Sequence, residues 1–384
     1  MGEAVPETQT PEAAPILSVV LPVLDEAADL GRLLVEIRAQ HPPPGGFEVI
    51  VVDGGSRDAT RAIVTEAAAA WPALRLLDNP RRLSSAARNI GARAARGRYV
   101  LYLDGHCALP RPDYLVRTVA LFEATGASCL SRPQPLTDLA TGRWPRAIAA
   151  ARHSPLGHNP GSDIYRTEPG FTDPRSAGAA YERIWIDRLG GYDERFDACE
   201  DVEFNHRVAR ADLAAYCHPD LALAYRPRRT LRALFQQMAR YGRGRARLLA
   251  RHPSAIPWPL IILTGLPLAL LATLLAAGLA IGALAAAGLT LLYILLLAAE
   301  SLRLESLTPT AVRVFLALGT IHAGLVLGFW RGLPEFGRFR APPAAGRTGT
   351  AGTAGGTGGT GMTGTAGGTG GTSTTGTAGG IGRK

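Results

Sequence analysis

The sequence has few of the residues that mark several common classes of protein. Its four cysteines lie far apart and show no CxxC spacing, so they are predicted to be small buried residues, without a zinc site or a disulfide framework. Lys384 is the only lysine, and the formal net charge of +9 comes almost entirely from arginine. No dense basic block is present, which argues against nucleic acid and favours an anionic membrane surface or a phosphorylated substrate as the partner.

The glycine motifs that usually bind nucleotide phosphates are also missing. No GxGxxG follows the strand-like run at residues 16–23, and no P-loop occurs in the chain. These absences argue against a nicotinamide-dependent oxidoreductase and against a P-loop enzyme. A metal ion would then have to hold the diphosphate, which indicates a nucleotide-diphosphate donor.

Residues 15–232 have the pattern of an α/β domain. Short β-branched runs alternate with alanine-rich stretches of helical periodicity. Strands are predicted at residues 16–23, 47–55, 74–79 and 98–104, and helices at residues 28–40, 56–71 and 83–95. This alternation predicts a mostly parallel sheet flanked by helices, with ligands bound at the carboxyl ends of the strands.

A long uncharged stretch follows this domain. No charged residue occurs from Pro253 to Ala299, and the apolar stretch at residues 314–330 contains one histidine and no other ionisable group. A membrane span needs about 20 apolar residues. The sequence therefore predicts a membrane region at residues 254–331, with spans at about 257–280, 284–300 and 312–330 and a tight turn near Gly282–Gly288.

The direction of the third apolar stretch stays open. Three spans that start from a cytoplasmic domain would place the next segment outside the cell, yet the arginines of that segment favour the inside. They are Arg331, Arg338, Arg340 and Arg347. The stretch is re-entrant, or one span is miscounted, or the positive-inside rule is overridden.

The two ends of the chain are expected to carry no catalytic residue. Residues 1–14 are acidic and lack the apolar core of a signal peptide, so the domain that follows is expected to stay in the cytoplasm behind a flexible N-terminus. Residues 345–384 are rich in Gly, Thr and Ala and are expected to be disordered.

Two predicted strands end in carboxylates. Asp53 ends VIVVD and Asp104 ends LYLD, which places both at the ligand-binding edge of a parallel sheet. Asp53 suits a ribose hydroxyl or a base N–H, with helix capping as the structural alternative. In an extended segment Asp104 and His106 face one side, and an oxygen with an imidazole suits Mn²⁺ or Mg²⁺ bound to phosphate. Gly105 would let that ligand approach the backbone.

Two later segments carry further candidates. In EDVEFNHR, the carboxylates of Glu200, Asp201 and Glu203 begin a helix, where they can stabilise its N-terminus or place a general base against an acceptor hydroxyl. The basic segment at residues 233–253 directly precedes the apolar region. It is predicted to form a helix at an anionic membrane interface.

Five segments, taken in order, resemble family 2 glycosyltransferases of the GT-A fold. They are SVVLPVLDEA, VIVVDGGSRDAT, SSAARNIGARAARGRYVLYLDGH, GGYDERFDACEDVEFNHRV and QMARYGRGRA. DGH, EDVEFNHR and RYGRGRA are most similar to the succinoglycan-biosynthesis type of bacterial exopolysaccharide glucosyltransferase. The resemblance covers about residues 16–250, and it implies a GT-A domain at residues 15–232 followed by C-terminal transmembrane helices.

The resemblance also implies roles for the residues that bind the donor. Those that border the nucleotide pocket are Pro22, Asp25 and Glu26, with Asp53 on the base or ribose. Those that face the diphosphate are Arg88 and the metal ligands Asp104 and His106. The metal motif is DxH instead of DxD, which removes one negative charge from the site.

On the acceptor side, the resemblance implies that Asp201 of the Glu200-Asp201 pair is the catalytic base. Gln237, Arg240 and Tyr241 match the QxxRW motif, which contacts the acceptor and the diphosphate, in the form QxxRY. Because tyrosine replaces tryptophan, transfer of one sugar is expected rather than processive polymerisation.

The implied function is inverting, metal-dependent transfer from a nucleotide-diphosphate sugar, a UDP-linked hexose, to a lipid-linked saccharide in exopolysaccharide or cell-envelope glycan synthesis. Mg²⁺ or Mn²⁺ is the expected cofactor. The expected location is the inner membrane, as a multi-pass protein whose catalytic domain faces the cytoplasm. A polyprenyl-phosphate sugar synthase and a catalytically inactive membrane assembly partner remain as alternatives.

Overall fold

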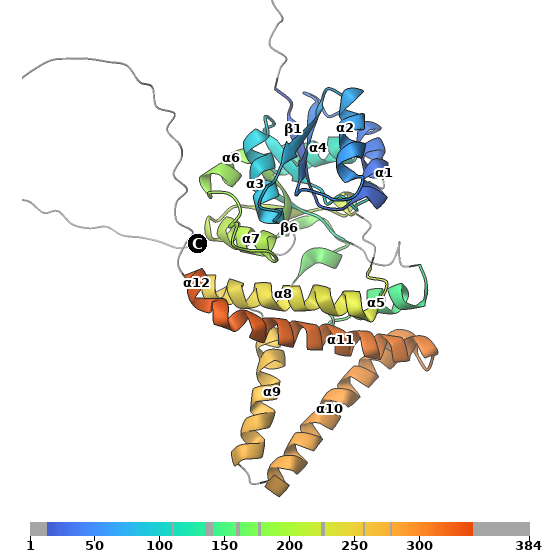
Figure 1. Cartoon of the computed structure of the whole chain (residues 1–384), viewed down its shortest axis with the longest axis vertical. Coiled ribbons are helices and arrows are strands. Elements are labelled where there is room, and N and C mark those ends of the chain that lie inside the picture. Colours follow the sequence, from blue (N-terminus) through green and yellow to red (C-terminus); the bar gives the residue numbers. More distant parts are fainter. Residues whose placement is uncertain are drawn as a thin grey trace, which may run out of the picture. The chain divides into compact units, whose positions relative to one another are not determined.

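The computed structural model describes residues 14–109, 111–134, 141–158, 162–175, 178–223, 227–255, 258–276 and 279–340. The N-terminus that was expected to be flexible, except for Ala14, and the Gly/Thr/Ala-rich tail lie outside these residues. Figure 1 shows the helices and strands of the described part with their labels.

The first four strands alternate with helices as the sequence predicts. The strands are β1 (Leu17–Val23), β2 (Phe47–Asp53), β3 (Leu74–Asp78) and β4 (Tyr99–Tyr102). The helices between them are α1 (Ala27–Arg38), α2 (Thr60–Ala69) and α3 (Ser84–Ala94). All three pairings among these strands are parallel.

Burial of apolar side chains holds this layer together. Every residue of β2 after Phe47 is buried, and a strand covered on both faces carries a continuous apolar run instead of an alternating one. Helix α1 packs against the sheet through side chains at helical spacing, which are Leu30, Leu33, Leu34 and Ile37. The predicted periodicities of strand and helix therefore both mark the core.

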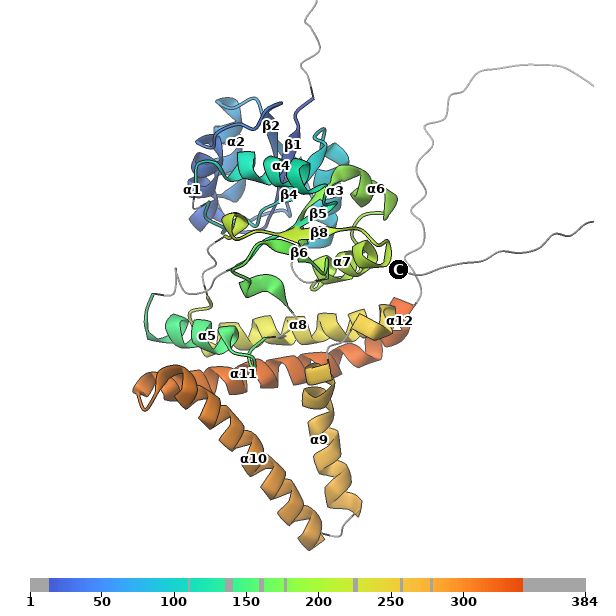
Figure 2. The same cartoon turned by 180° about the vertical axis from the view of Figure 1, so that it is seen from behind.

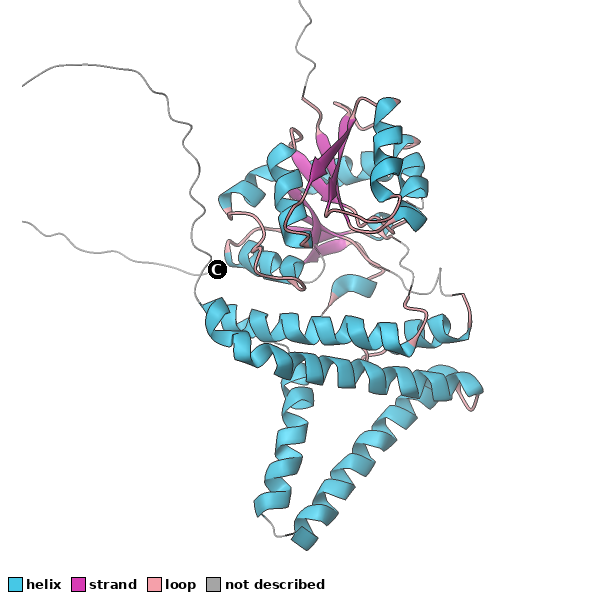
Figure 3. Cartoon of the chain, in the orientation of Figure 1, coloured by secondary structure: helices cyan, strands magenta, loops and turns pink. Residues whose placement is uncertain are grey.

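The remainder of the sheet is mixed. The strand order is β3-β2-β1-β4-β7-β5-β8-β6, and Figure 3 shows the strands with helices around them. The later strands are β5 (Cys129–Ser131), β6 (Gly170–Thr172), β7 (Gly178–Glu182) and β8 (Ala215–Cys217). β7 is antiparallel to both β4 and β5. The expected parallel sheet is thus present in its first four strands, and antiparallel pairs appear beyond β4.

The remaining helices of the α/β domain lie among these strands in the sequence. They are α4 (Tyr114–Thr125), α6 (Arg183–Arg188) and α7 (Glu200–Arg210). Helix α5 (Arg143–His153) packs instead against the C-terminal helices through its alanines and Ile148. Short 3-10 helices occur at Asp163–Tyr165, Pro219–Leu221, Pro253–Ala255 and Leu333–Glu335.

The strand order reverses between β1 and β4. The chain passes from β1 outward to β2 and β3 and then returns to the other side of β1 to form β4. In open α/β sheets, ligands bind at the position where the strand order reverses in this way. The loops after β1 and β4 are therefore the first place to look for a site.

In the described residues after position 230, five α-helices follow the α/β domain. They are α8 (Leu231–Arg251), α9 (Trp258–Ala276), α10 (Leu279–Glu305), α11 (Pro309–Gly332) and α12 (Phe336–Arg340). Helix α10 already begins at Leu279, so the predicted turn at Gly282–Gly288 lies inside it and the break comes earlier in the chain. Figures 1 and 2 show α8 and α11 side by side, with α9 and α10 projecting from this pair.

Close contact between α8 and α11 depends on glycine. Gly324, Gly328 and Gly332 recur every four residues on α11 and face α8. A Cβ atom at Gly328 would lie 2.0 Å from the carbonyl oxygen of Ala239, and one at Gly242 would lie 2.2 Å from that of Leu325. Small residues at this spacing let two helix backbones approach closely, as they do in membrane proteins.

Two of the C-terminal helical segments are long and apolar enough to cross a membrane, namely Ile281–Glu305 and Pro309–Arg340. A shorter apolar helix covers Pro259–Leu275. Only 11% of the most apolar stretch of Ile281–Glu305 is buried within the protein, compared with 44% for Pro309–Arg340. Helix α10 thus exposes much of its apolar surface, whereas α8 covers part of α11.

Substitution of Gly328 by alanine tests this helix packing. The added methyl group collides with the backbone of α8, and overpacking of this kind costs about 1–3 kcal/mol of stability. The matched control is Gly319→Ala on the same helix, where a Cβ atom would meet nothing within 4 Å. In detergent, Gly328→Ala should lower the thermal unfolding midpoint while Gly319→Ala should not. Equal midpoints for the two variants would contradict the packing.

Candidate active site

Asp53 closes β2 with its carboxylate held in a local network. The residue is 1% exposed, and its carboxylate accepts hydrogen bonds from the amide and hydroxyl of Ser56 and from Arg61. Asp58 accepts the hydrogen bond from the amide of Thr60, the first residue of α2, at 3.0 Å. Asp58 thus supports the start of this helix, and Asp53 stays at the edge of the sheet.

The loop after β1 joins this edge to the loop after β4. The amide of Asp25 donates to the hydroxyl of Ser56 at 2.9 Å, and its carboxylate accepts the amide of Arg57 at 2.7 Å. The next residue, Glu26, places its carboxylate 3.0 Å from Nδ1 of His106. Pro22, within β1, pairs with Val52 beside Asp53. The residues expected to border a nucleotide therefore belong to one connected edge.

The segment Asp104-Gly105-His106 forms a turn, which corrects the expectation of an extended chain. β4 ends at Tyr102, and the amide of Cys107 donates to the carbonyl oxygen of Asp104. Gly105 admits the neighbouring loop rather than only a ligand, because a Cβ atom there would lie 3.0 Å from Cγ of Glu26. The tight turn still keeps the Asp104 carboxylate close to the imidazole.

Opposite charges stabilise the ionised forms of this pair. Burial opposes ionisation of Asp104, but Arg88, Arg132 and His106 outweigh it and lower the pKa of the carboxyl. The hydrogen bond to Glu26 raises the pKa of His106 above its usual value, and the Asp104 charge adds to this effect. Within the described part of the chain, no group of three or more His, Cys, Asp and Glu side chains is arranged around a common metal position.

Arg88 of α3 connects the end of β4 with the start of α7. Its guanidinium lies 3.4 Å from the carboxylate of Asp104 and 3.7 Å from that of Glu200. Tyr102 and Tyr192 flank it, with ring centres 5.1 Å and 5.6 Å from the guanidinium carbon. Burial alone would lower the pKa of Arg88, but the surrounding tyrosine and carboxyl groups raise it, so the side chain stays charged.

The two acids at the start of α7 occupy different environments. Glu200 is mostly buried, and burial together with the Asp201 charge raises its pKa, against the opposing effect of Arg88. Asp201 is exposed. Cys199, directly before them, has a φ angle of 62°, a left-handed conformation that is rare for this residue type. Such strain persists only where surrounding contacts enforce it.

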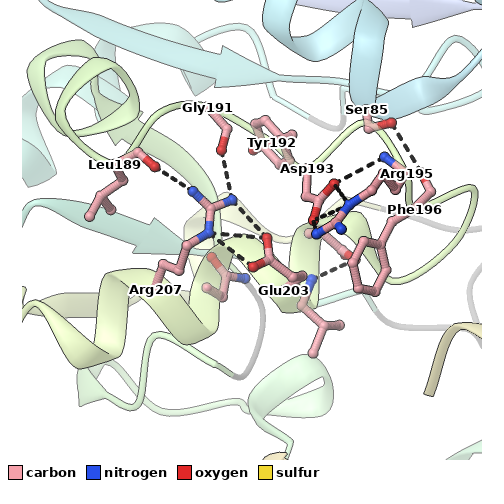
Figure 4. A network of polar contacts seen from close by, with 12 residues as sticks. Ser85, Leu189, Gly191, Tyr192, Asp193, Arg195, Phe196, Glu203 and Arg207 are labelled. Carbon is pink, nitrogen blue, oxygen red and sulfur yellow. Dashed lines mark hydrogen bonds and ion pairs between the residues drawn. The ribbon is translucent and has the colours of Figure 1, made fainter. Parts of the chain in front are cut away.

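Contacts from two directions fix the loop that leads into α7. Figure 4 shows Arg207 of α7 donating to the carbonyl oxygens of Leu189 and Gly191, with Glu203 holding its guanidinium. From α3, Ser85 donates to the carbonyl oxygen of Phe196. Glu203 is therefore structural, since its buried carboxylate is shared by Arg207 and His252.

Asn89 adds a third clamp on this loop. Its side-chain amide pairs with both backbone groups of Tyr192, at 2.7 Å and 2.9 Å. Gly191 has no side chain that could block this approach, because a Cβ atom there would lie 2.5 Å from the Asn89 side chain. The helix that carries Arg88 therefore also positions the segment that leads to Glu200.

The QxxRY motif lies on α8, beside the start of α7. The side chain of Gln237 is buried and donates to the hydroxyl of Tyr241 at 3.2 Å. The carbonyl oxygen of Tyr241 lies 3.8 Å from the sulfur of Cys199, next to Glu200. Arg240 is exposed on the adjacent face of the helix. The backbone of Tyr241 thus lies near the start of α7, its ring packs in the apolar cluster that includes Leu234 and Leu318, and Arg240 is at the surface.

Two further arginines lie at the candidate site and were not predicted from the sequence. Arg132, which follows β5, is buried, donates to the carbonyl oxygen of Tyr102 at 2.7 Å and helps to lower the pKa of Asp104. Arg228 precedes α8 and donates to the side chain of Gln237 at 3.3 Å, and its positive charge partly opposes the rise in the pKa of His106. Each is one arginine in an arginine-rich chain, so only the fold distinguishes them.

Comparison with known proteins identifies the family of this chain. Residues 18–185 match glycosyl transferase family 2. The chain is 33% identical over 236 residues to the succinoglycan biosynthesis protein ExoA of Rhizobium meliloti (strain 1021), which covers 61% of this chain and 70% of that protein. It is 21% identical over 330 residues to the dolichyl N-acetyl-alpha-D-glucosaminyl phosphate 3-beta-D-2,3-diacetamido-2,3-dideoxy-beta-D-glucuronosyltransferase of Methanococcus voltae, covering 83% of this chain and 97% of that one.

A solved structure shares the fold. The mannosyltransferase PcManGT from Pyrobaculum calidifontis, in complex with GDP-Man and Mn²⁺, has a TM-score of 0.56 at 22% sequence identity, and the match covers 84% of this chain and 88% of that one. The mixed sheet flanked by helices agrees with this likeness. The chain belongs to glycosyl transferase family 2 and is a glycosyltransferase with the GT-A fold.

Proposed function

We propose that this glycosyltransferase moves one sugar from a nucleotide-diphosphate donor, a UDP-linked hexose, to a lipid-linked saccharide at the membrane, with inversion of configuration. The product would enter exopolysaccharide or cell-envelope glycan synthesis. The observation that carries the proposal is the position of Arg88 between Asp104 and Glu200. The guanidinium of Arg88 contacts both the sheet edge where the diphosphate would lie and the start of α7, which would supply the base.

The donor would lie along the edge formed by the loops after β1, β2 and β4. Asp53, with Pro22 and the loop of Asp25 and Glu26, would border the base and ribose. Arg88 would face the diphosphate, where its charge stabilises the departing nucleotide. The structural neighbour from Pyrobaculum calidifontis, which was solved with GDP-Man and Mn²⁺, supports a nucleotide sugar as the donor class.

Asp104 and His106 fit a divalent cation that arrives with the diphosphate. They offer one carboxylate, which the low pKa of Asp104 keeps negative, and one imidazole, whose raised pKa means that a bound cation would have to displace a proton from the ring. Mg²⁺ typically takes one or two protein carboxylates and fills its remaining positions with phosphate and water. When bound, such a cation neutralises charge on the leaving diphosphate. Glu26 would orient the His106 ring through Nδ1, as second partners of metal-binding histidines do.

On the acceptor side, exposure separates the two acids. Asp201 is open to solvent, so an acceptor hydroxyl can reach its carboxylate, whereas Glu200 is covered beside Arg88. Asp201 would remove the hydroxyl proton as the oxygen attacks the anomeric carbon from the face opposite the diphosphate. A single displacement inverts the configuration and requires no covalent enzyme intermediate.

An apolar groove supports a lipid-linked acceptor. A cavity of about 530 Å³ lies between α8, α10 and α11, and its walls are mostly apolar, including Leu231, Phe235, Leu297 and Phe315. Arg232 contributes a positive charge for a phosphate at the same cavity. Two relatives are named for succinoglycan biosynthesis and for transfer to a dolichyl-linked saccharide. We propose that the groove holds the hydrocarbon chain of the acceptor.

The helix arrangement also supports a location at the cytoplasmic face of the inner membrane. An arginine-rich helix such as α8 cannot cross a bilayer, and α11 packs along it over three glycine contacts. Both would therefore lie at the interface, while α9 and α10 cross as a hairpin. This arrangement keeps the arginines after α11 on the side of the catalytic domain, as the positive-inside rule requires.

Asp201→Asn tests the proposed base. The amide cannot accept the proton, so transfer should fall by about 10²- to 10⁴-fold while donor binding is retained. Asp212→Asn is a matched control, because Asp212 is exposed after the other end of α7 and asparagine tolerates its φ angle of 53°. Transfer and donor affinity are measured on the protein in detergent. Full activity of Asp201→Asn would remove this residue from the mechanism.

Metal removal tests Asp104 and His106. EDTA should stop release of nucleotide from the donor in the presence of acceptor, and added Mn²⁺ or Mg²⁺ should restore it. Asp104→Ala should not recover at any concentration of either cation, because the oxygen ligand is lost. Turnover that is unaffected by EDTA would contradict the metal assignment.

Mass spectrometry of the product distinguishes an extended lipid-linked saccharide from one sugar on a lipid monophosphate.

A reporter fused after Arg340 tests the hairpin. If only α9 and α10 cross, a reporter that is active in the cytoplasm should be active there, and a phosphatase that requires the periplasm should be inactive. The same reporters fused after Ala283, between α9 and the main part of α10, should give the opposite pattern. A periplasmic position after Arg340 would show that α11 crosses as a third span.

A further inference from the structure

A second cavity lies between the second half of α7 and the C-terminal end of α8. Its volume is about 290 Å³. Its lining comes from three places, namely the second half of α7, the last turn of α8 with the residues after it, and the turn that follows β6. The lining residues are Arg175, His206, Ala209, Arg210, Arg251, His252, Pro253 and Ser254.

The charged groups that line this cavity are all basic. Arg175, Arg210 and Arg251 bring three guanidinium groups, and no carboxylate is among the lining residues. Two acids bind residues of this lining and neutralise part of its charge. Asp173 binds Arg175 through both oxygens, and Glu203 is shared by Arg207 and His252 behind the wall.

One of these arginines has a buried group without a partner. Among the described residues, the Nε atom of Arg251 is buried and makes no hydrogen bond. A buried donor without an acceptor is uncommon and costs about 1–3 kcal/mol. A cation at the end of α8 also interacts well with the helix dipole, but that effect does not require a buried, unpaired Nε–H. The cavity in front of Arg251 has room for the missing acceptor.

His206 forms part of the wall of this pocket. It is buried and stacks on His252, with ring centres 5.3 Å apart. Burial, followed by the nearby charges of His252, Arg175 and Arg245, lowers the pKa of His206 to about 4, and Asp173 opposes this shift only in part. Burial and these neighbouring cations both disfavour the protonated form, so the ring adds no positive charge to the pocket at pH 7.

We propose that this pocket binds a phosphate group. Guanidinium groups match phosphate oxygens with paired hydrogen bonds, and Ser254 and the two imidazoles add further donors. Pro253 and Ser254 line the pocket, and the apolar helix α9 begins a few residues later at Trp258. If α9 enters the bilayer, the pocket lies at the depth of lipid headgroups. The phosphate can therefore belong to an anionic phospholipid or to a soluble ion, and the pocket chemistry suits both.

The test uses the full chain purified in detergent. One arm titrates inorganic phosphate at constant ionic strength and follows the thermal unfolding midpoint. The other arm incorporates the protein into nanodiscs of phosphatidylcholine with or without phosphatidylglycerol and measures the same midpoint. A saturable rise in the first arm identifies a soluble phosphate ligand, and a rise with phosphatidylglycerol alone identifies a lipid headgroup. No saturable rise in either arm overturns the proposal.

Variants assign the effect to this pocket. Arg251→Gln should weaken the saturable effect at least tenfold. Arg210→Gln is a second variant, since Arg210 is exposed at the rim and its loss should not disturb folding. The matched control is Arg93→Gln, which removes one exposed arginine from α3. Equal losses in Arg93→Gln and the pocket variants would show a general charge effect and overturn the proposal.

Discussion

The site depends on one buried guanidinium. Arg88 lies between the carboxylates of Asp104 and Glu200 and is flanked by Tyr102 and Tyr192. An isolated buried charge costs several kcal/mol, so Arg88 requires the carboxylates beside it. The two carboxylates in turn can lie close to each other only because Arg88 stands between them. Without Arg88, the loop after β4 and the start of α7 would repel each other. The distance between the loop after β4 and the start of α7 is therefore set by electrostatics as much as by the sheet.

The position of Arg88 is in turn fixed by packing. Helix α3 lies directly on β1, since a Cβ atom at Gly91 would fall 2.2 Å from Cγ1 of Val20. The same helix uses Ser85 and Asn89 to hold the loop that enters α7. One rigid element thus orients both partners of the arginine. This arrangement also explains how Cys199 is kept in a left-handed conformation immediately before Glu200 and Asp201.

Helix α8 connects the catalytic domain to the apolar helices through opposite faces. Gly244 and Tyr241 lie against the start of α7, and Gly242 lies against α11. Two of its arginines, Arg243 and Arg247, bind Asp197 and so serve the internal structure. Its basic composition therefore divides between ion pairs inside the protein and charges that remain for anionic groups outside it.

Much of this protein was determined by local sequence. The alternation of apolar strands with amphipathic helices sets the elements from β1 to β4, because burial patterns of period 2 and 3.6 are properties of neighbouring residues. The carboxylates at the ends of β2 and β4 follow from the same pattern. The resemblance added the family, which the comparisons confirm. In the C-terminal region the sequence showed long uncharged runs, but it did not show how the helices formed by them pack together.

The tertiary structure decided what no local pattern contains. It made Glu203 structural by bringing His252 to it from 49 residues away, and it recruited Arg132 and Arg228 to the site from segments with no motif. It also laid α11 along α8 and turned Asp104-Gly105-His106 against Glu26. Except for the contact between Arg228 and Gln237, these contacts join residues far apart in the chain. Which residues meet depends on the strand order and on the close approach of helices. The local sequence around either partner does not specify these two features.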